Sequence, residues 1–195
     1  MRSRTVKKAL FIVAFFVAAI SLAVAGKPPS GPTIYVVNGD FESGMNSWSS
    51  AGDTAADFTE SSGRTGDRLT HWAASSFQVY TYQVITGLSN GTYSLSVWAV
   101  GDAATTSYLY AKNFGSSELN ANLPLPITWG NWTKVTINGI VVSNGQCEVG
   151  VYTDSANYVS FDDFELIEDD STPGPTPTAT PTQGPTPSPG NLQIG

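Results

Sequence analysis

Short β-rich runs separated by turn residues fill the chain from residue 33 to residue 168, and helical periodicity is almost absent there. The runs cover residues 33–37, 68–72, 77–85, 92–100, 106–112, 131–142, 146–153 and 158–167. Breaks such as LSNG (88–91) and VSNG (142–145) supply the glycine and asparagine that tight turns favour. Many short strands without helices predict one all-β domain, a two-sheet β-sandwich of the jelly-roll type.

Both ends of the chain differ in composition from this domain. Residues 1–25 start with basic side chains, continue with an apolar run and end in small residues, which predicts a signal peptide and a secreted, extracellular protein. A retained membrane anchor is the alternative. Residues 171–190 are rich in proline and threonine and predict an extended linker. We expect residues 191–195 to begin a following module that this chain does not contain.

The balance of charge restricts the class of partner. Without residues 1–25 the chain has five basic and sixteen acidic residues, a net charge of −11. Such a surface disfavours nucleic acid, anionic membranes and acidic polysaccharides, and leaves neutral partners. One histidine, His71, and one cysteine, Cys147, are too few for a zinc site, and we expect the thiol to be buried.

Alternation along YSLSVWAVGD (93–102) isolates one bulky side chain. Tyr93, Leu95, Val97 and Ala99 form an apolar set that predicts a core face. Trp98 belongs to the opposite, polar set. Either a second layer covers its indole, or the ring contacts something outside the domain.

The same alternation in the other runs predicts which side chains share the outward side with Trp98. In residues 79–84 it assigns Tyr80, Tyr82 and Val84 to the core. Gly150 is expected to leave room for a ring to approach the sheet. The outward set so predicted comprises Gln83, Tyr108, Tyr110, Lys112 and Tyr152.

Aromatic and long polar side chains on one face suit a sugar. An aromatic ring stacks on the C–H face of a pyranose, and amide, amine and carboxylate groups bind its hydroxyls. Burial in the core is the alternative for Trp98 and for Trp72. The candidate carbohydrate-binding residues are Trp98, Tyr110, Lys112 and Asn113, followed by Trp72, Trp129 and Tyr152.

Acidic residues near the two ends of the domain raise the possibility of a cation. NGDFESG (38–44) supplies Asp40 and Glu42, and FDDFE (161–165) supplies Asp162 and Asp163. Carboxylates with turn carbonyls are ligands for Ca²⁺ when the first and last strands are neighbours. A solvated acidic surface is the alternative.

The chain contains the stretches VNGDFESG, GRTGDRLTHW, YQVITGLSNGTYSLSVWA, LYAKNFG, NWTKVTINGIVVSNGQCEVGVYTD and FDDFEL. Together these six stretches resemble carbohydrate-binding module family 61. The resemblance covers residues 34–167, and its most specific parts are AKNFG and NGQCEVGVYTD. The other parts recur in galactose-binding-like jelly rolls of several families.

The resemblance implies a galactose-binding-like two-sheet jelly roll and a structural Ca²⁺. The cation would be held by the Glu42 and Asp162 side chains, the Asp40 carbonyl and the carbonyls of Arg64 and Asp67. It also implies a non-catalytic module that holds a secreted endo-β-1,4-galactanase on β-1,4-galactan, with the catalytic domain tethered beyond the linker. A jelly-roll polysaccharide-degrading enzyme and a calcium-stiffened adhesion module of the cell surface are the alternative functions.

Overall fold

The computed structural model describes residues 33–169 of the chain. The predictions for residues 1–25, 171–190 and 191–195 therefore lie outside the described residues. Within the described range no helix is long and apolar enough to cross a membrane. The elements are β1 (Ser49–Gly52), the 3-10 helix η1 (Thr54–Ala56), β2 (Asp57–Ser61), β3 (Asp67–His71), β4 (Phe77–Thr86), β5 (Gly91–Gly101), β6 (Thr106–Lys112), β7 (Leu119–Asn122), β8 (Thr133–Val142), β9 (Gln146–Ser155) and β10 (Val159–Glu168).

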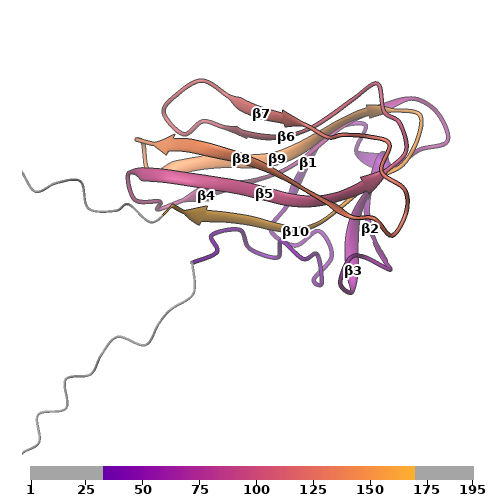
Figure 1. Ribbon diagram of the computed structural model, residues 1–195, viewed down its shortest axis with the longest axis horizontal. Helices are drawn as coiled ribbons and strands as arrows, with labels where there is room; N and C mark the ends of the chain where they lie inside the picture. The colour runs from indigo at the N-terminus through magenta and orange to yellow at the C-terminus, as the bar shows by residue number, and fades with distance from the viewer. Residues whose placement is uncertain (1–32, 170–195) are drawn as a thin grey trace, which may run out of the picture. The chain divides into compact units, whose positions relative to one another are not determined.

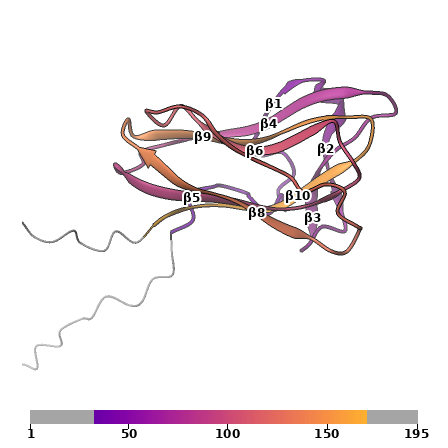
Figure 2. The same ribbon diagram turned by 45° about the horizontal axis from the view of Figure 1, so that its top comes forward.

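The strands form two antiparallel sheets that pack face to face. One sheet has the order β1-β4-β9-β6-β7, and the other has the order β2-β3-β10-β5-β8. The two layers are separate in Figure 2, with β4, β6 and β9 in one and β5, β8 and β10 in the other. Figure 1 shows β2 and β3 at one end of the layers. The predicted β-sandwich is confirmed.

The core lies between the sheets and is built from alternate residues of the long strands. Tyr93, Leu95, Val97 and Ala99 of β5 are fully buried, as alternation predicts. In the facing sheet the inward residues include Cys147, whose thiol is free and buried. Leu109, Ala111, Val149 and Val151 complete the inward sets of β6 and β9.

For β4 the predicted orientation is wrong. Thr81 and Gln83 point into the domain and are buried, while Val84 is 50% exposed. Polar side chains are stable inside because they find partners there. Thr81 Oγ1 lies 2.8 Å from His71 Nε2. The Gln83 amide receives the Val37 N–H and donates to the Val37 carbonyl, both at 2.9 Å.

The chain's first and last described segments are neighbours. Ile34 forms an antiparallel bridge with Ile167. Trp48 closes the same region of the core: its Nε1–H donates to the Asn38 carbonyl at 2.9 Å, and its ring packs on Phe164. This neighbourhood brings residues 38–44 close to β10.

Candidate functional site

Five of the chain's eight tyrosines lie on the outer surface of the sheet β1-β4-β9-β6-β7. Tyr80, Tyr152 and Tyr108 pair directly across β4, β9 and β6 and form one row. In the next row Gly150 lies between Tyr82 and Tyr110. We call the surface formed by these five tyrosines the tyrosine face. Because alternate residues of neighbouring strands stand side by side, the pleat aligns their side chains.

The rings of the first row stack on one another. The centroids of Tyr80 and Tyr152 are 4.4 Å apart with an interplanar angle of 38°, and those of Tyr108 and Tyr152 are 5.1 Å apart at 36°. All three side chains are half-buried. Three strands at about 4.8 Å spacing make the row about 10 Å long. The row offers ring edges and hydroxyls along a strip that no described segment covers with a second layer.

A charged pair borders the tyrosine face. Lys112 Nζ lies 3.0 Å from Glu148 Oε1, and the amine also sits 5.0 Å from the ring centroid of Tyr110. The Tyr110 hydroxyl donates to Glu148 Oε1 at 3.1 Å, and Asn113 Nδ2 donates to Glu148 Oε2 at 3.0 Å. Glu148 is therefore held by three donors while Lys112 and Asn113 stay accessible to solvent. Such a cluster can bind hydroxyl groups without carrying net charge.

Gly150 does not provide the open space that the sequence suggested. A Cβ at this position would lie 2.4 Å from the Thr81 carbonyl oxygen and 2.9 Å from the Tyr110 hydroxyl. The missing side chain instead lets Tyr110 fold down against the sheet, where it is 1% exposed. Tyr110 is thus a supporting residue of the tyrosine face and holds Glu148 in place.

The hydroxyls of Tyr108, Tyr110 and Tyr152 stay neutral in ordinary solution. Burial raises the pKa of Tyr108, Tyr110 and Tyr152 above the usual value, and the Glu148 carboxylate raises that of Tyr110 further. A neutral hydroxyl both donates and accepts hydrogen bonds, as a sugar hydroxyl does.

Trp98 does not belong to this surface. It lies on β5 in the opposite sheet, so the predicted grouping of Trp98 with Tyr110, Lys112 and Asn113 is wrong. Its indole is not bare: the Arg64 guanidinium lies 4.1 Å above the ring centroid. Arg64 is in turn paired with Asp163. This cation–π contact partly covers the outward tryptophan, which alternation alone could not foresee.

Trp72 and Trp129 lie together on the side of the domain that carries Trp98. Each is 48% exposed. They line a pocket of about 490 Å³, which we call the tryptophan pocket. The structure thus divides the seven candidate residues between two surfaces. The tryptophan pocket is lined by Phe58, Glu60, Arg68, Thr70, Trp72, Trp129 and Tyr158.

His71, the one histidine, is unsuited to surface catalysis. Its side chain is fully buried between the sheets, with Nδ1 2.9 Å from Thr153 Oγ1 and Nε2 2.8 Å from Thr81 Oγ1. Burial lowers its pKa to about 3. The ring is therefore neutral at ordinary pH and out of reach of a polysaccharide.

Oxygen atoms of the predicted calcium ligands gather around the turn between β2 and β3. Asp162 is fully buried, and desolvation raises its pKa to about 6. A Cβ on Gly63 would lie 2.4 Å from the Asp67 carbonyl oxygen and 2.7 Å from Asp162 Oδ2, so these two oxygens are close together. Glu42 Oε1 accepts the Asp67 N–H at 2.7 Å. These hard oxygen donors fit Ca²⁺.

Arg64 could contribute only through its backbone carbonyl, the atom that the resemblance implies. The Arg64 side chain is committed to Asp163 and Trp98. Asp40 is exposed and borders a shallow depression that Asp163 also lines. Among residues 33–169 no three His, Cys, Asp or Glu side chains converge as a metal site, so carbonyls would have to complete the coordination.

Comparison with solved structures identifies the fold. The domain is similar to TmCBM61, solved in complex with β-1,4-galactotriose: the TM-score is 0.64 at 22% identity, over 70% of this chain and 99% of that one. The domain has the fold of a family 61 carbohydrate-binding module. The resemblance seen in the sequence is confirmed at this level. No family model matches the chain.

Two further solved structures are similar to the domain, with lower TM-scores. A putative sugar-binding protein from Bacteroides thetaiotaomicron has a TM-score of 0.55 at 14% identity, over 70% of this chain and all of that one. A family 16 carbohydrate-binding module has a TM-score of 0.51 at 19% identity, over 69% of this chain and 99% of that one.

One curated relative matches in sequence. It is a 1,6-α-glucosyltransferase of Sporosarcina globispora, 30% identical over an alignment of 154 residues that covers 70% of this chain. The chain spans only 12% of that relative's length.

Sequence reasoning missed three members of the tyrosine face or its border. Alternation assigns Tyr80 and Tyr82 to the core, and the sequence pattern does not single out Glu148 as a binding residue. The V-Y-T-Y-Q-V pattern carries apolar residues on both alternating sets, so only the partners of Thr81 and Gln83 decide its orientation.

Proposed function

We propose that this domain is a non-catalytic carbohydrate-binding module that holds a neutral β-linked glycan, β-1,4-galactan, on the tyrosine face. The observation that carries the proposal is the row Tyr80–Tyr152–Tyr108, in register across three strands beside Lys112. The exposed ring edges remove sugar C–H groups from water, and the hydroxyls with Lys112 fix orientation. The fold shared with TmCBM61, which was solved with β-1,4-galactotriose, supports this ligand.

The wider context belongs to the same proposal. The protein is secreted, and its linker tethers the module to a catalytic domain, an endo-β-1,4-galactanase. Tethering raises the concentration of the enzyme near its substrate even where the affinity of the module is weak. The tyrosine face supplies binding groups but no exposed histidine, which supports a role in targeting.

Calcium is also part of the proposal. Glu42, Asp162 and the Asp67 carbonyl would hold Ca²⁺ between the β2–β3 turn and β10. The ion would supply a positively charged partner for the buried Asp162 carboxylate. The β2–β3 turn and β10, which the ion would join, belong to the sheet opposite the tyrosine face. The role proposed for the ion is therefore structural.

Electrophoresis of the full chain in a native gel containing β-1,4-galactan tests the ligand and the surface together. The wild-type protein is expected to be retarded by galactan and not by pectate, which is acidic. Tyr152→Ala removes the middle of the row and should weaken binding at least tenfold, about 1.4 kcal/mol. Thr136→Ala, exposed on β8 of the other sheet, is the control. Equal retardation of both variants would move the site elsewhere, and wild-type mobility unaffected by galactan would reject the ligand.

A further inference from the structure

The tryptophan pocket lies on the sheet opposite the tyrosine face. Phe58 and Glu60 come from β2, Arg68 and Thr70 from β3, and these strands belong to the sheet β2-β3-β10-β5-β8. The pocket of about 490 Å³ falls within the range of roughly 300–1,000 Å³ usual for small-molecule sites. A ligand seated here cannot also touch the tyrosine face, because the sandwich core separates them.

Arg68 supports the Trp129 ring, which lines this pocket. Arg68 is 8% exposed, and its guanidinium lies 4.6 Å from the ring centroid of Trp129. Its Nε donates to Ser160 Oγ at 3.2 Å, Nη1 donates to the Ser62 carbonyl at 2.8 Å, and Nη2 pairs with Glu60 at 2.9 Å. Because all three guanidinium nitrogens of Arg68 have partners, the guanidinium is held in one place and fixes the orientation of the Trp129 ring. A half-exposed indole that is already ordered loses little entropy when a ring stacks on it.

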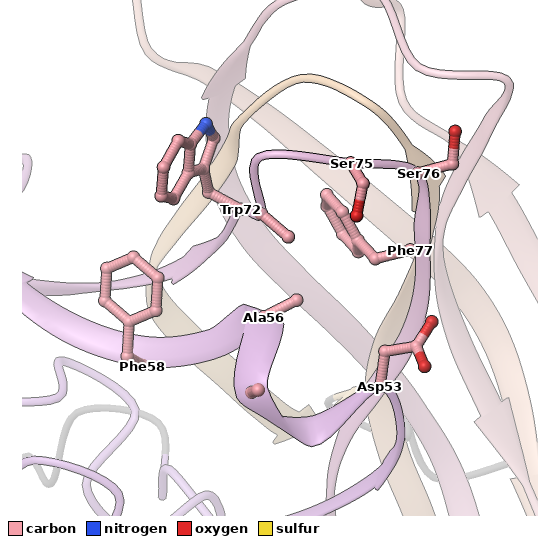
Figure 3. A pocket seen from close by; sticks show the side chains of 9 residues that line it. Asp53, Ala56, Phe58, Trp72, Ser75, Ser76 and Phe77 are labelled. Carbon is pink, nitrogen blue, oxygen red and sulfur yellow. The ribbon is translucent and has the colours of Figure 1, made fainter.

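Trp72 forms a wall shared with a neighbouring hollow. Its backbone N–H donates to the Ala56 carbonyl at 2.8 Å, which anchors the residue just after β3. Figure 3 shows the Trp72 indole standing beside Phe58, with Phe77 and Asp53 across the hollow. This second hollow measures about 350 Å³ and shares Trp72 and Phe58 with the tryptophan pocket. The two hollows therefore continue each other along one strip of aromatic rings.

The charges around the strip favour a neutral ligand with hydroxyl groups. Arg68 is neutralised by Glu60, whose side chain is 41% exposed and can accept hydrogen bonds at the rim. Asp53 and Ser75 offer further acceptors and donors in the second hollow. The Glu60 and Asp53 carboxylates disfavour an anionic ligand, whereas they can accept hydrogen bonds from sugar hydroxyls. Aromatic walls with a few polar groups match the two kinds of surface on a pyranose.

We propose that the tryptophan pocket is a second, independent carbohydrate site for hexose units of a neutral glycan, which makes one domain bivalent. The ligand class rests on the proposed function, but the location does not. Two sites on opposite faces let one module bind two chains, or two turns of one polysaccharide, and gain avidity on an insoluble matrix without a second domain.

Indole N–H signals in a ¹⁵N-labelled full chain test this inference. The five tryptophans give five such signals, which Trp→Phe variants assign. On titration with β-1,4-galactotriose the signals of Trp72 and Trp129 should shift, while that of Trp48, in the core, should not. The shifts should persist in Tyr152→Ala and disappear in Trp129→Ala, with the melting temperature checked for each variant. The matched variant Trp98→Ala should leave them unchanged.

The results separate the two proposals. If galactan retards the wild-type chain but Trp72 and Trp129 do not shift, the second site is wrong and the tyrosine face stands. If their shifts vanish in Tyr152→Ala, the two surfaces are not independent, and the inference is overturned. If Trp72 and Trp129 shift with an affinity that Tyr152→Ala does not change, while retardation is lost only in Trp129→Ala, the second site stands and the tyrosine face fails.

Discussion

The Arg64 guanidinium lies over the indole of Trp98, with its carbon 4.1 Å from the ring centroid. Arg64, in the turn between β2 and β3, also pairs with Asp163 of β10. One contact thus joins the loop of the proposed calcium site to the outward tryptophan. It explains why a tryptophan can occupy the polar side of β5 without serving as a sugar platform.

Trp98→Ala is expected to leave galactan retardation unchanged. The ring lies on the sheet opposite the tyrosine face and is covered by Arg64. The substitution removes packing and a cation–π contact, so stability should fall by about 1–2 kcal/mol, seen as a lower urea midpoint. Loss of retardation with an unchanged midpoint would restore Trp98 as a binding residue.

Lys112 and Lys134 form a matched pair for testing the tyrosine face. Each is a partly exposed lysine paired with a glutamate, at 3.0 Å and 2.9 Å, but they lie on opposite sheets. Lys112→Met should weaken galactan binding about tenfold, because a charged hydrogen-bond donor beside the Tyr110 ring is lost. Lys134→Met should bind as the wild type does in the same titration. Equal affinities of the two variants would exclude Lys112 from the site.

Calcium should raise the melting temperature, and EDTA should reverse the effect. A ligand at one hundred times its Kd stabilises the folded state by about 2.7 kcal/mol. Asp162→Asn removes the buried carboxylate and should abolish the response to calcium, measured by differential scanning calorimetry. Asp102→Asn, exposed on the turn after β5, should keep it. A wild-type melting temperature indifferent to both additions would indicate a solvated acidic surface.

Acid should destabilise the domain through His71. Burial lowers its folded pKa to about 3, below the ordinary 6.5, so the unfolded chain binds the extra proton between these values. The stability that His71 contributes is complete above pH 6.5 and decreases as the pH falls toward 3. At pH 4 the loss is about 3 kcal/mol. Urea midpoints from pH 7 to pH 4 should therefore decline less steeply in His71→Gln.

One neighbouring group acts in the opposite direction. Desolvation raises the pKa of Asp57, whose Oδ1 lies 3.8 Å from His71 Nε2. Its contribution is present at low pH and is lost as the pH rises above 3.8 through the raised value. The comparison of wild type with His71→Gln isolates the histidine if Asp57→Asn is measured alongside. Parallel pH profiles for wild type and His71→Gln would refute the account.

Alternation predicted β5, β6 and β9 well because their inward sets are plainly apolar, whereas the mixed sets of β4 gave the wrong orientation. The runs 92–100, 106–112 and 146–153 match β5, β6 and β9 closely. The three missed strands, β1, β2 and β7, have four or five residues and few β-branched side chains. All three are edge strands. Hydrogen bonds to a single partner strand therefore stabilise each of them more than its own pattern of apolar residues does.

The sequence by itself determined the fold class, the buried set of β5 and β9, and the kind of chemistry that aromatic and polar side chains could perform. Period-two alternation and turn residues are local properties, so they can be read without a partner. Only the tertiary structure decided which aromatic residues share a surface. Tyr80 faces outward because Thr81 meets His71 inside, and Trp98 is parted from Tyr110 because β5 and β6 belong to different sheets. Pairing between strands distant in sequence determines these relations.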